Sequence, residues 1–381
     1  MNCSYREQMD AYAYDMCSWA DAWRHALTCI GYEVEAIVPN ARKMQFAWAR
    51  ENGINISGRH ALADIAVEQV GRFNPEVLWF NSRDAVLLQR IQQKVPGLTL
   101  ILGWVGSAVP NSEIWHDMDL VFSCAPESVD KLRTKGVRAE HLDHAFDPRI
   151  IARLVERPAR MDISFVGHVV RGREYHFERE EILKLLAAKF RLKIFSPSAD
   201  FGWREELKAR LLEAGYCAVK GMQRVGFPDS LLSALPLFGN AVHWHDRPLA
   251  PVHPALKPYL EKAVYGIDMY QVLHESQVTL NIHADSSPQY ASNMRLYEAT
   301  GACTCLLTDF RPNLTELFVA DKEVVAYASH AECVEKVAWL LAHPVERAAL
   351  ARAGRARVLK EHTYAHRALR FDQIVRRSLP S

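Results

Sequence analysis

Three neighbouring segments decide the fold: SQVTLNIH (residues 276–283), SNMRLYEATG (292–301) and TCLLTD (304–309). The first and third are short runs rich in apolar and β-branched residues, which predicts buried strands. The second has the spacing of a helix, and Ser292 is well placed to cap its first turn. A strand, a helix and a strand in succession form a βαβ unit, so we expect a parallel sheet here.

The same alternation extends over nearly the whole chain. In the first half we expect strands at Val34–Val38, Val77–Phe80, Leu98–Leu102 and Leu120–Ser123, after a long helical pattern from Ser4 to Cys29. In the second half we expect strands at Ile163–Val166, Leu192–Phe195, Val278–Ile282 and Thr304–Thr308. A charged segment with two prolines, residues 146–161, separates the halves. The pattern predicts an α/β fold with two Rossmann-like, doubly wound domains, 1–150 and 151–360, that face a cleft. A closing helix at 361–381 is expected to pack back toward the first domain.

Composition excludes several classes of protein. With 381 residues, 49% of them hydrophobic, the chain can bury two cores, which excludes disordered and fibrous classes. Lys and Arg total 46 against 45 for Asp and Glu, so no chain-wide field attracts nucleic acid, and we expect no nucleic-acid partner. The eight scattered cysteines, the lack of a secretory leader and the lack of a membrane-length apolar run predict a cytoplasmic protein with reduced thiols.

The expected helix at 293–301 carries the most informative polar pair. Arg295 and Glu298 are three residues apart and would share one helical face. A helix N-terminus at the cleft attracts phosphate, Arg295 could add a phosphate contact, and Glu298 could accept both hydroxyls of a ribose. The alternative is an ordinary βαβ unit in which the two residues form a surface ion pair. Spacing alone favours this alternative, because short motifs have a high false-positive rate outside their structural context.

A wider set of motifs resembles one enzyme family. NMRLYEA (293–299), together with VYG (264–266), Tyr270 and the strand that ends at His283, resembles the C-terminal half of GT-B-fold glycosyltransferases. The spore-maturation (CgeB-like) branch, which is related to the family 4 enzymes, is the most similar. Other segments that agree with this branch are SYREQ (4–8), GYEV (31–34), NPEV (74–77), HAFDP (144–148), FVGH (165–168), NLTELF (313–318), AGRARV (353–358) and HTYAHR (362–367).

The resemblance implies that the protein transfers a sugar from a nucleoside diphosphate donor. Glu298 matches the Glu that holds the donor ribose, and the loop that contains Ser292 and Asn293 matches the phosphate-facing turn. Family 4 enzymes carry a second Glu beside the transferred sugar where this chain has Tyr290, so the stereochemical outcome does not carry over. Relatives also begin with a strand and a glycine-containing loop that precede the helix opening this sequence. The acceptor therefore stays open, as a glycan, a lipid-linked molecule, a protein or a small molecule.

Other candidates for donor binding follow the expected strand at 163–166. Gly167 would let the backbone approach a diphosphate, and His168 and Arg171 could neutralise charge on the leaving group. The alternative is a turn glycine with solvated basic side chains. His283, at the end of the strand at 278–282, and Arg295, on the helix that follows, are candidate catalytic residues.

The first domain is expected to form the acceptor side. GWVGS (103–107) follows a buried strand and would line the cleft through Trp104, Gly106 and Ser107, with Trp104 stacked on a sugar. A buried structural role is the alternative for Trp104, and it is favoured because large aromatic side chains are mostly in cores. Asp84 is the best candidate for a general base, with a helix cap as its alternative.

No metal site is expected. Asp117 and Asp119 match the DxD pattern, but they precede the strand at 120–123, and alternation directs them away from the cleft. HWHD (243–246) has metal-capable side chains, yet contiguous residues rarely act together as ligands. We therefore predict a metal-independent enzyme without a cofactor, in which the helix N-terminus and Arg or His side chains stabilise the leaving diphosphate.

Two other functions are compatible with these residues. One is a nucleotide-sugar epimerase of the same fold, and the other is a non-catalytic sugar-nucleotide-binding protein, for which Tyr290 is the main argument.

The segment from Leu341 onward contains nine Lys or Arg residues against three acidic residues. This composition is typical of a solvated helix face, and it is also compatible with peripheral attachment to the inner face of a membrane.

Overall fold

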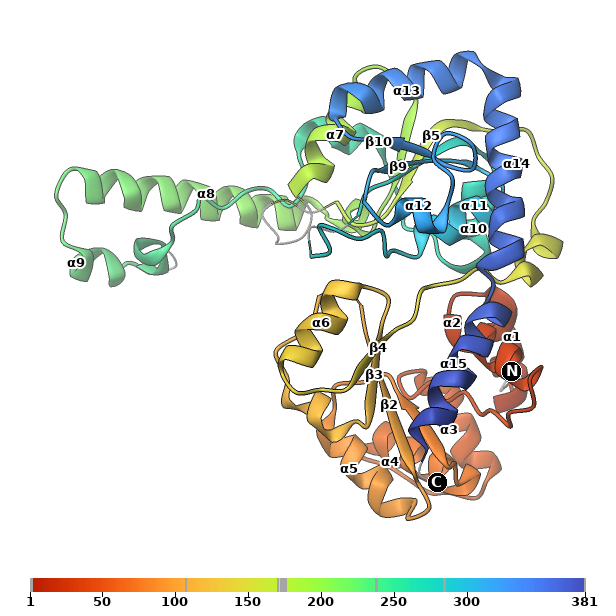
Figure 1. The fold of residues 1–381 in the computed structure, drawn as a ribbon. Coiled ribbons are helices and arrows are strands. Elements are labelled where there is room, and N and C mark those ends of the chain that lie inside the picture. The colour runs from red at the N-terminus through yellow and green to blue at the C-terminus, as the bar shows by residue number, and fades with distance from the viewer. Residues whose placement is uncertain are drawn as a thin grey trace.

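Two parallel sheets organise the chain in the computed structural model, which describes residues 3–106, 108–169, 171, 177–236, 239–283 and 286–379 (Figure 1). The first sheet has the order β1 (Val77–Phe80), β2 (Leu100–Val105), β3 (Leu120–Ser123), β4 (Ala139–His141). The second has the order β10 (Val325–Tyr327), β9 (Cys305–Asp309), β8 (Ser276–Asn281), β5 (Met161–Val166), β6 (Leu192–Phe195), β7 (Leu260–Glu261). All neighbouring strands are parallel, which confirms the predicted α/β fold class.

Helices connect the strands and cover both sheets. They are α1 (Tyr5–Asp15), α2 (Trp19–Thr28), α3 (Arg42–Glu51), α4 (Ala61–Phe73), α5 (Ala85–Lys94), α6 (Pro126–Thr134), α7 (Phe177–Ala187), α8 (Trp203–Arg224), α9 (Asp229–Ser233), α10 (Gly266–His274), α11 (Arg295–Gly301), α12 (Leu314–Leu317), α13 (His330–Ala342), α14 (Pro344–Glu361) and α15 (Tyr364–Ser378). Short 3-10 turns are η1 (Glu113–Asp117), η2 (Pro148–Arg153), η3 (Pro197–Asp200), η4 (Gly239–His243) and η5 (Pro254–Tyr259). None of the helices in these ranges combines the length and the apolar character that crossing a bilayer requires.

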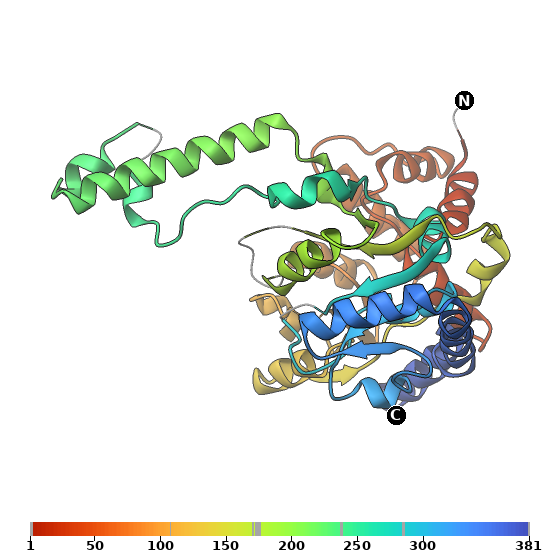
Figure 2. The ribbon, with the colours of Figure 1, turned by 90° about the horizontal axis from the view of Figure 1, so that it is seen from above.

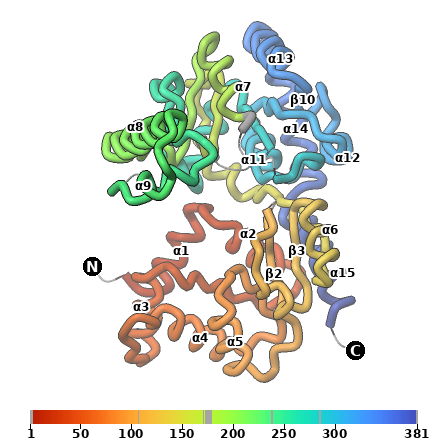
Figure 3. The backbone as a smooth tube through the Cα atoms, turned by 90° about the vertical axis from the view of Figure 1, so that its left-hand side faces the viewer, coloured from red at the N-terminus to blue at the C-terminus, as the bar shows by residue number. Residues whose placement is uncertain are grey.

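Helices cover both faces of the first sheet. Successive residues of a strand point to opposite sides, so each strand contributes side chains to both of these packed faces. Leu100 and Leu102 of β2 pack with residues of α2 and α15, including Trp23 and Phe371. Ile101, between them, packs on the other face with residues of α4, α5 and α6. The last helix of the chain, α15, thus lies on the sheet formed by the first half, in the lower body of Figure 3.

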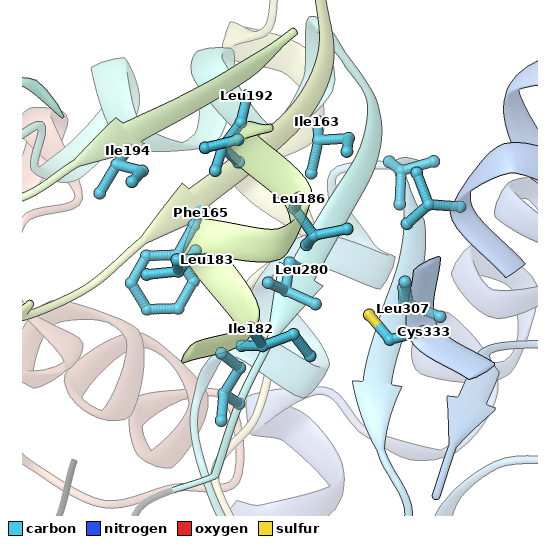
Figure 4. Close-up of a cluster of buried hydrophobic side chains, with 14 of the residues drawn as sticks. Ile163, Phe165, Ile182, Leu183, Leu186, Leu192, Ile194, Leu280, Leu307 and Cys333 are labelled. Carbon is cyan, nitrogen blue, oxygen red and sulfur yellow. The ribbon is translucent and has the colours of Figure 1, made fainter. Parts of the chain in front are cut away.

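The second sheet is covered in the same way. Figure 4 shows one face, where Ile163 and Phe165 of β5 and Leu280 of β8 meet Ile182 and Leu186 of α7. Helix α13 joins this cluster through Cys333, Val337 and Leu340. The other face packs against α10, α11 and α14, whose buried side chains include Leu273, Leu296 and Val358.

The chain crosses between the two domains twice, around Phe146 and around His362 and Tyr364, and the two crossing segments lie side by side. The backbone N–H of Phe146 donates to the carbonyl of His362 at 2.9 Å, and the N–H of Tyr364 donates to the carbonyl of Phe146 at 3.2 Å. Phe146 is fully buried, and its ring lies where a Cβ on Gly301 of α11 would stand. Because the two segments are hydrogen-bonded to each other, any domain rotation has to bend both of them at one place.

A helical arm projects from the second domain between β6 and β7. It consists of α8, α9 and η4, and in Figures 1 and 2 it extends well beyond the rest of the chain. Helix α8 continues to Arg224, whereas the sequence pattern in this region predicts a helix only over 204–213.

Two expectations for the first half are wrong. The helical pattern of residues 4–29 forms two helices, because Met16 adopts a left-handed φ of 56° and Ser18 caps α2. Val34–Val38 belongs to neither sheet, and the carbonyl of Val38 accepts from the Gln45 side chain at 3.0 Å. β-branched residues favour a strand only where a neighbouring strand supplies a hydrogen-bonded ladder.

Candidate active site at the strand-order switch of the second sheet

The strand order of the second sheet reverses between β5 and β8. From β5 the chain proceeds outward to β6 and β7, and then returns to place β8 on the other side of β5. Ligands of open parallel sheets bind beyond the carboxyl ends of the strands at such a switch. Gly167 and His168 follow β5 there, and His283 follows β8. The structure therefore brings three of the predicted site residues to one edge of the sheet.

His283 is held by an acidic residue from the next strand. Its Nδ1 lies 2.7 Å from Oδ1 of Asp309, which ends β9, and its backbone N–H donates to the same oxygen at 3.0 Å. Arg311 pairs with the other carboxylate oxygen of Asp309 at 2.8 Å. Burial alone would raise the pKa of Asp309, but the hydrogen bonds from His283 and the charge of Arg311 lower it below its ordinary value. An ionised Asp309 accepts from Nδ1, so it orients the imidazole with Nε2 as its free atom.

A chain of amide contacts shapes the loop after β8. Asn281 donates to the hydroxyl of Thr308 at 2.9 Å and accepts from the side-chain amide of Asn293 at 2.7 Å. Asn313, before α12, accepts from the N–H of Ala291 at 2.6 Å and donates to its carbonyl at 3.1 Å. The loop before α11 is thereby tied to β8, β9 and the start of α12.

Helix α11 begins later than the sequence pattern predicts. Its first residue is Arg295, its N-cap is Met294 in a helical conformation, and no side chain caps it. Ser292 is buried and its hydroxyl contacts that of Ser287 at 3.4 Å, so the expected capping role is wrong. Ser292 stands two residues before the cap position, which puts its side chain out of reach of the first-turn N–H groups.

Arg295 and Glu298 form a buried pair. Nη1 of Arg295 lies 2.6 Å from a carboxylate oxygen of Glu298, whose side chain is only 6% exposed. The other oxygen lies 3.5 Å from the hydroxyl of Tyr270 on α10. Burial, followed by the charge of Glu298, raises the pKa of Tyr270 well above its ordinary value, so this hydroxyl stays protonated. The alternative of a surface ion pair is therefore excluded by the burial.

Several buried polar atoms around the switch have no partner within the described residues. They are Nε2 of His283, Oδ1 of Asn293 and Nε of Arg295. Leaving a buried polar atom without a hydrogen bond costs about 1–3 kcal/mol, so such atoms in a folded protein call for an explanation. Three of them within one loop-and-helix region are what a polar ligand or ordered water would satisfy.

The loop after β5 contains a residue that sequence reasoning missed. Arg179 of α7 donates to the carbonyl of His168 at 3.2 Å and to the carbonyl of Ile282 at 3.0 Å, which ties together the two loops of the switch. His168 itself is exposed. Arg171 pairs with Glu180 of α7 at 2.7 Å. No local pattern distinguishes Arg179 from the other charges of its helix, since its partners are backbone atoms of two distant loops.

The loop after β8 also contacts the first domain. Ser287 donates to Glu127, in the first turn of α6, at 2.9 Å, and the N–H of Gln289 donates to the same carboxylate at 3.0 Å. The neighbouring Tyr290 occupies the position of the second Glu of family 4 enzymes and offers its carbonyl to Ser287 at 3.1 Å. The switch region thus faces α6 across the domain boundary.

Two of the predicted acceptor-side residues, Trp104 and Asp84, have structural roles in a strand and at a helix cap. Trp104 lies within β2 rather than in a loop, because hydrogen-bond pairing with β3 continues to Val105, and its ring packs 5.5 Å from that of Trp19. Gly106 follows the strand, and its carbonyl accepts from Ser123 at 3.2 Å. Ser107 lies outside the described residues. Asp84 caps α5 by accepting from the N–H of Leu87 at 3.0 Å.

Asp119 of the DxD pattern has a structural contact. Its carboxylate accepts from the N–H of Ile101 at 2.7 Å at the start of β3, the end remote from the carboxyl edge. HWHD (243–246) lies in the arm, at the end of η4. Among the residues that the structure describes, no three His, Cys, Asp or Glu side chains are grouped closely enough to hold a metal ion.

Residues 179–373, half of the chain, match the model of the glycosyl transferase-like family. The chain belongs to this family. The matched region contains the switch-point residues of β8 and α11, including Glu298 and His283. No curated protein matches the chain.

Solved structures agree with this family. Anabaena Alr3699/HepE, determined in complex with UDP-glucose, has a TM-score of 0.52 at 10% identity, with 87% of this chain and 88% of that chain covered. AviGT4, a glycosyltransferase involved in avilamycin A biosynthesis, has a TM-score of 0.51 at 14% identity, with 94% of this chain and 87% of that chain covered. A glycosyltransferase from Rickettsia africae ESF-5 has a TM-score of 0.50 at 9% identity, with 87% of each chain covered. The chain is therefore a glycosyltransferase with the GT-B fold.

Proposed function

We propose that this glycosyltransferase moves a sugar from a nucleoside diphosphate sugar to an acceptor without a divalent metal, as a member of the spore-maturation (CgeB-like) branch. The observation that carries the proposal is the buried Glu298 carboxylate on α11, together with polar atoms of His283, Asn293 and Arg295 that have no partner among the described residues. Residues 151–360 would bind the donor, and residues 1–150 would form the acceptor side.

Glu298 is suited to hold a ribose. A carboxylate with two accepting oxygens can take both hydroxyls of a ribose, and a buried site strengthens these bonds. In the structure, Arg295 and Tyr270 contact those oxygens. The donor would replace the weaker contact, at 3.5 Å, and leave Arg295 to neutralise the carboxylate.

The diphosphate would lie at the switch. When the bond between the anomeric carbon and the β-phosphate oxygen breaks, its electron pair goes to the diphosphate, while the acceptor oxygen bonds to carbon and gives up its proton. Nε of Arg295 can donate to the diphosphate, and Nε2 of His283 would donate as well when both ring nitrogens carry a proton, since Nδ1–H is already directed at Asp309. Glu298 and Asp309, two carboxylates of this region, are both paired with Arg or His side chains, which favours cationic rather than metal stabilisation.

Calorimetry with a panel of nucleotides tests the donor site. UDP and UDP-glucose are the first probes, followed by GDP, dTDP and CMP with their sugar conjugates. We expect Glu298→Ala to weaken binding by about ten- to hundredfold, since a lost charge-assisted hydrogen bond costs about 1.5–3 kcal/mol. Glu298→Gln keeps the shape of the site, and Glu316→Gln, on the exposed face of α12, is the matched control.

The outcome separates the functions. Unchanged affinity in Glu298→Ala, with the fold intact by circular dichroism, would assign Glu298 a structural role. Incubation with the donor alone distinguishes transfer from epimerisation, since an epimerase would change the sugar without an acceptor. Binding with no turnover across a broad acceptor panel would contradict the transfer reaction.

A further inference from the structure

The arm carries a continuous apolar face that nothing in the described chain covers. On α8, Trp203, Leu207 and Leu211 follow one another at four-residue spacing and are 70%, 48% and 52% exposed. The same face continues through the exposed Ala214, Ala218, Gly221 and Val225. Residues with this spacing share one side of a helix, so the face runs along the whole of α8. We call these seven residues the outer face of α8.

The tip of the arm exposes further apolar side chains. Val225 is 75% exposed, and Phe227 and Leu231 beyond it are 53% and 64% exposed. The inner side of α8 is already used, because Val219 packs with Leu232, Ala241 and Val242 of the returning chain. The exposed residues therefore do not stabilise the arm itself, and leaving this many large apolar side chains in water points to a partner.

Basic residues border the outer face on both sides. At 100° per residue, Arg204 and Lys208 lie along one edge, and Arg210 and Arg224 lie along the other. Arg204 stacks on the ring of Trp203, with its guanidinium carbon 5.5 Å from the ring centre. Lys208, Arg210 and Arg224 form no salt bridge within the described residues. Basic side chains without a salt bridge in the described residues therefore stand along both edges of the outer face.

The acidic residues of α8 are engaged within the chain, including Glu206, which lies along the same edge as Arg224. Glu206 pairs with Lys257 at 2.5 Å, and Glu213 pairs with Arg247 of the returning segment. Glu205 accepts from the N–H of Gly202 at 3.0 Å and caps the start of the helix. Because the acidic side chains are paired or used for capping, the charges left beside the apolar strip are cationic, which is the pattern of helices that lie in the interface of an anionic bilayer.

We infer that the arm docks the enzyme on an anionic lipid surface through the outer face of α8 and the tip. A second copy of this chain is a poor fit, because packing two outer faces together would juxtapose their positive edges. A bilayer also requires no complementary groove, which suits exposed apolar side chains on a projecting arm (Figure 1). The inference does not depend on the identity of the donor.

The basic C-terminal region fits this role less well. Arg357 pairs with Glu361 at 3.0 Å, Arg376 pairs with Asp372 at 2.8 Å, and Arg367 is largely buried at the domain junction. Several of its charges are therefore engaged within the chain. The structure favours the arm, rather than α14 and α15, as the place where a membrane is contacted.

Vesicle co-sedimentation of the full-length protein tests the inference. We expect binding to vesicles of phosphatidylglycerol and phosphatidylcholine, weaker binding to phosphatidylcholine alone, and loss of binding with added salt. The double substitution Leu207→Glu and Leu211→Glu should lower the partition coefficient by at least about tenfold, because two side chains lose their burial in lipid. Both residues are exposed, so the fold should survive, and thermal melting with UDP-binding calorimetry would verify this.

Two controls make the result decisive. Leu369→Glu places the same charge on an exposed leucine of α15 and should leave vesicle binding unchanged, whereas Lys208→Glu with Arg210→Glu should weaken it. Absence of binding to the anionic vesicles, or equal binding by the Leu207 and Leu211 variant, would overturn the inference. A wild-type dimer in light scattering that the same double substitution dissociates would instead assign the face to a second copy.

Discussion

Asp309 holds His283 in one orientation at the switch between β5 and β8. The two side chains approach to 2.7 Å, and the backbone of His283 donates to the same carboxylate oxygen at 3.0 Å. His283 is almost completely buried, and its Nε2 has no partner in the described chain. A fixed imidazole with one free nitrogen is prepared to contact a ligand without a cost of reorientation.

Asp309→Asn tests this relationship. We expect donor affinity and turnover to fall by about ten- to hundredfold, because the neutral amide removes the charge-assisted hydrogen bond that orients His283. Unchanged donor affinity, with the fold intact by circular dichroism, would contradict this role of Asp309. The control is Asp321→Asn, which removes an exposed carboxylate far from His283 in sequence.

Chelation tests the leaving-group stabilisation. If Arg295 and His283 neutralise the diphosphate, EDTA should leave the rate nearly unchanged, while Arg295→Ala should lower turnover. Asp117→Asn should be nearly silent, because Asp117 stands at the end of η1, before β3 and away from its carboxyl edge. Activity abolished by EDTA and restored by manganese would contradict the proposal.

The packing of Phe146 on α11 predicts a sensitive position at the domain junction. Gly301→Ala should destabilise the protein by about 1–3 kcal/mol, because the new Cβ would meet the Phe146 ring in a fully buried site. Gly221→Ala, in open space on α8, should be neutral or slightly stabilising. Urea unfolding of both variants measures the difference, and equal stability would show that Phe146 can move aside.

His144 should make stability depend on pH. Burial lowers its pKa from the ordinary 6.5 to about 4. Between these two pH values His144 is protonated in the unfolded chain and neutral in the folded protein. The free energy of unfolding therefore falls as the pH is lowered through this window, by up to about 1.4 kcal/mol per pH unit. His144→Gln should flatten this dependence in urea unfolding at several pH values, while the exposed His116→Gln should not.

Domain closure is expected when the donor binds. The contact of Glu127 with Ser287 and Gln289 joins the domains beside the switch, while Phe146 pairs with Thr363 where the chain crosses between the domains. Small-angle scattering with and without UDP-sugar should show a more compact enzyme in the bound state. Identical profiles at verified saturation would argue against closure.

The sequence alone predicted the parts of the fold that depend on local patterns. The strands Val77–Phe80, Leu120–Ser123 and Leu192–Phe195 have the expected bounds, because they are short apolar runs between polar segments. The βαβ unit at 276–309 and the α/β class follow from the same patterns, and the family motif around Glu298 directed attention to α11. These features depend on residues that are close together along the chain.

Tertiary structure decided the remainder. The pairing of His283 with Asp309, the bridging of two loops by Arg179 and the burial of Glu298 each join residues from separate elements. Local spacing contains no information about which strands become neighbours, so it cannot place these contacts or show that Val34–Val38 lacks a ladder. The exposure of the outer face of α8 could not be predicted from local spacing either, since an apolar helix face is buried or exposed according to what the rest of the chain packs against it.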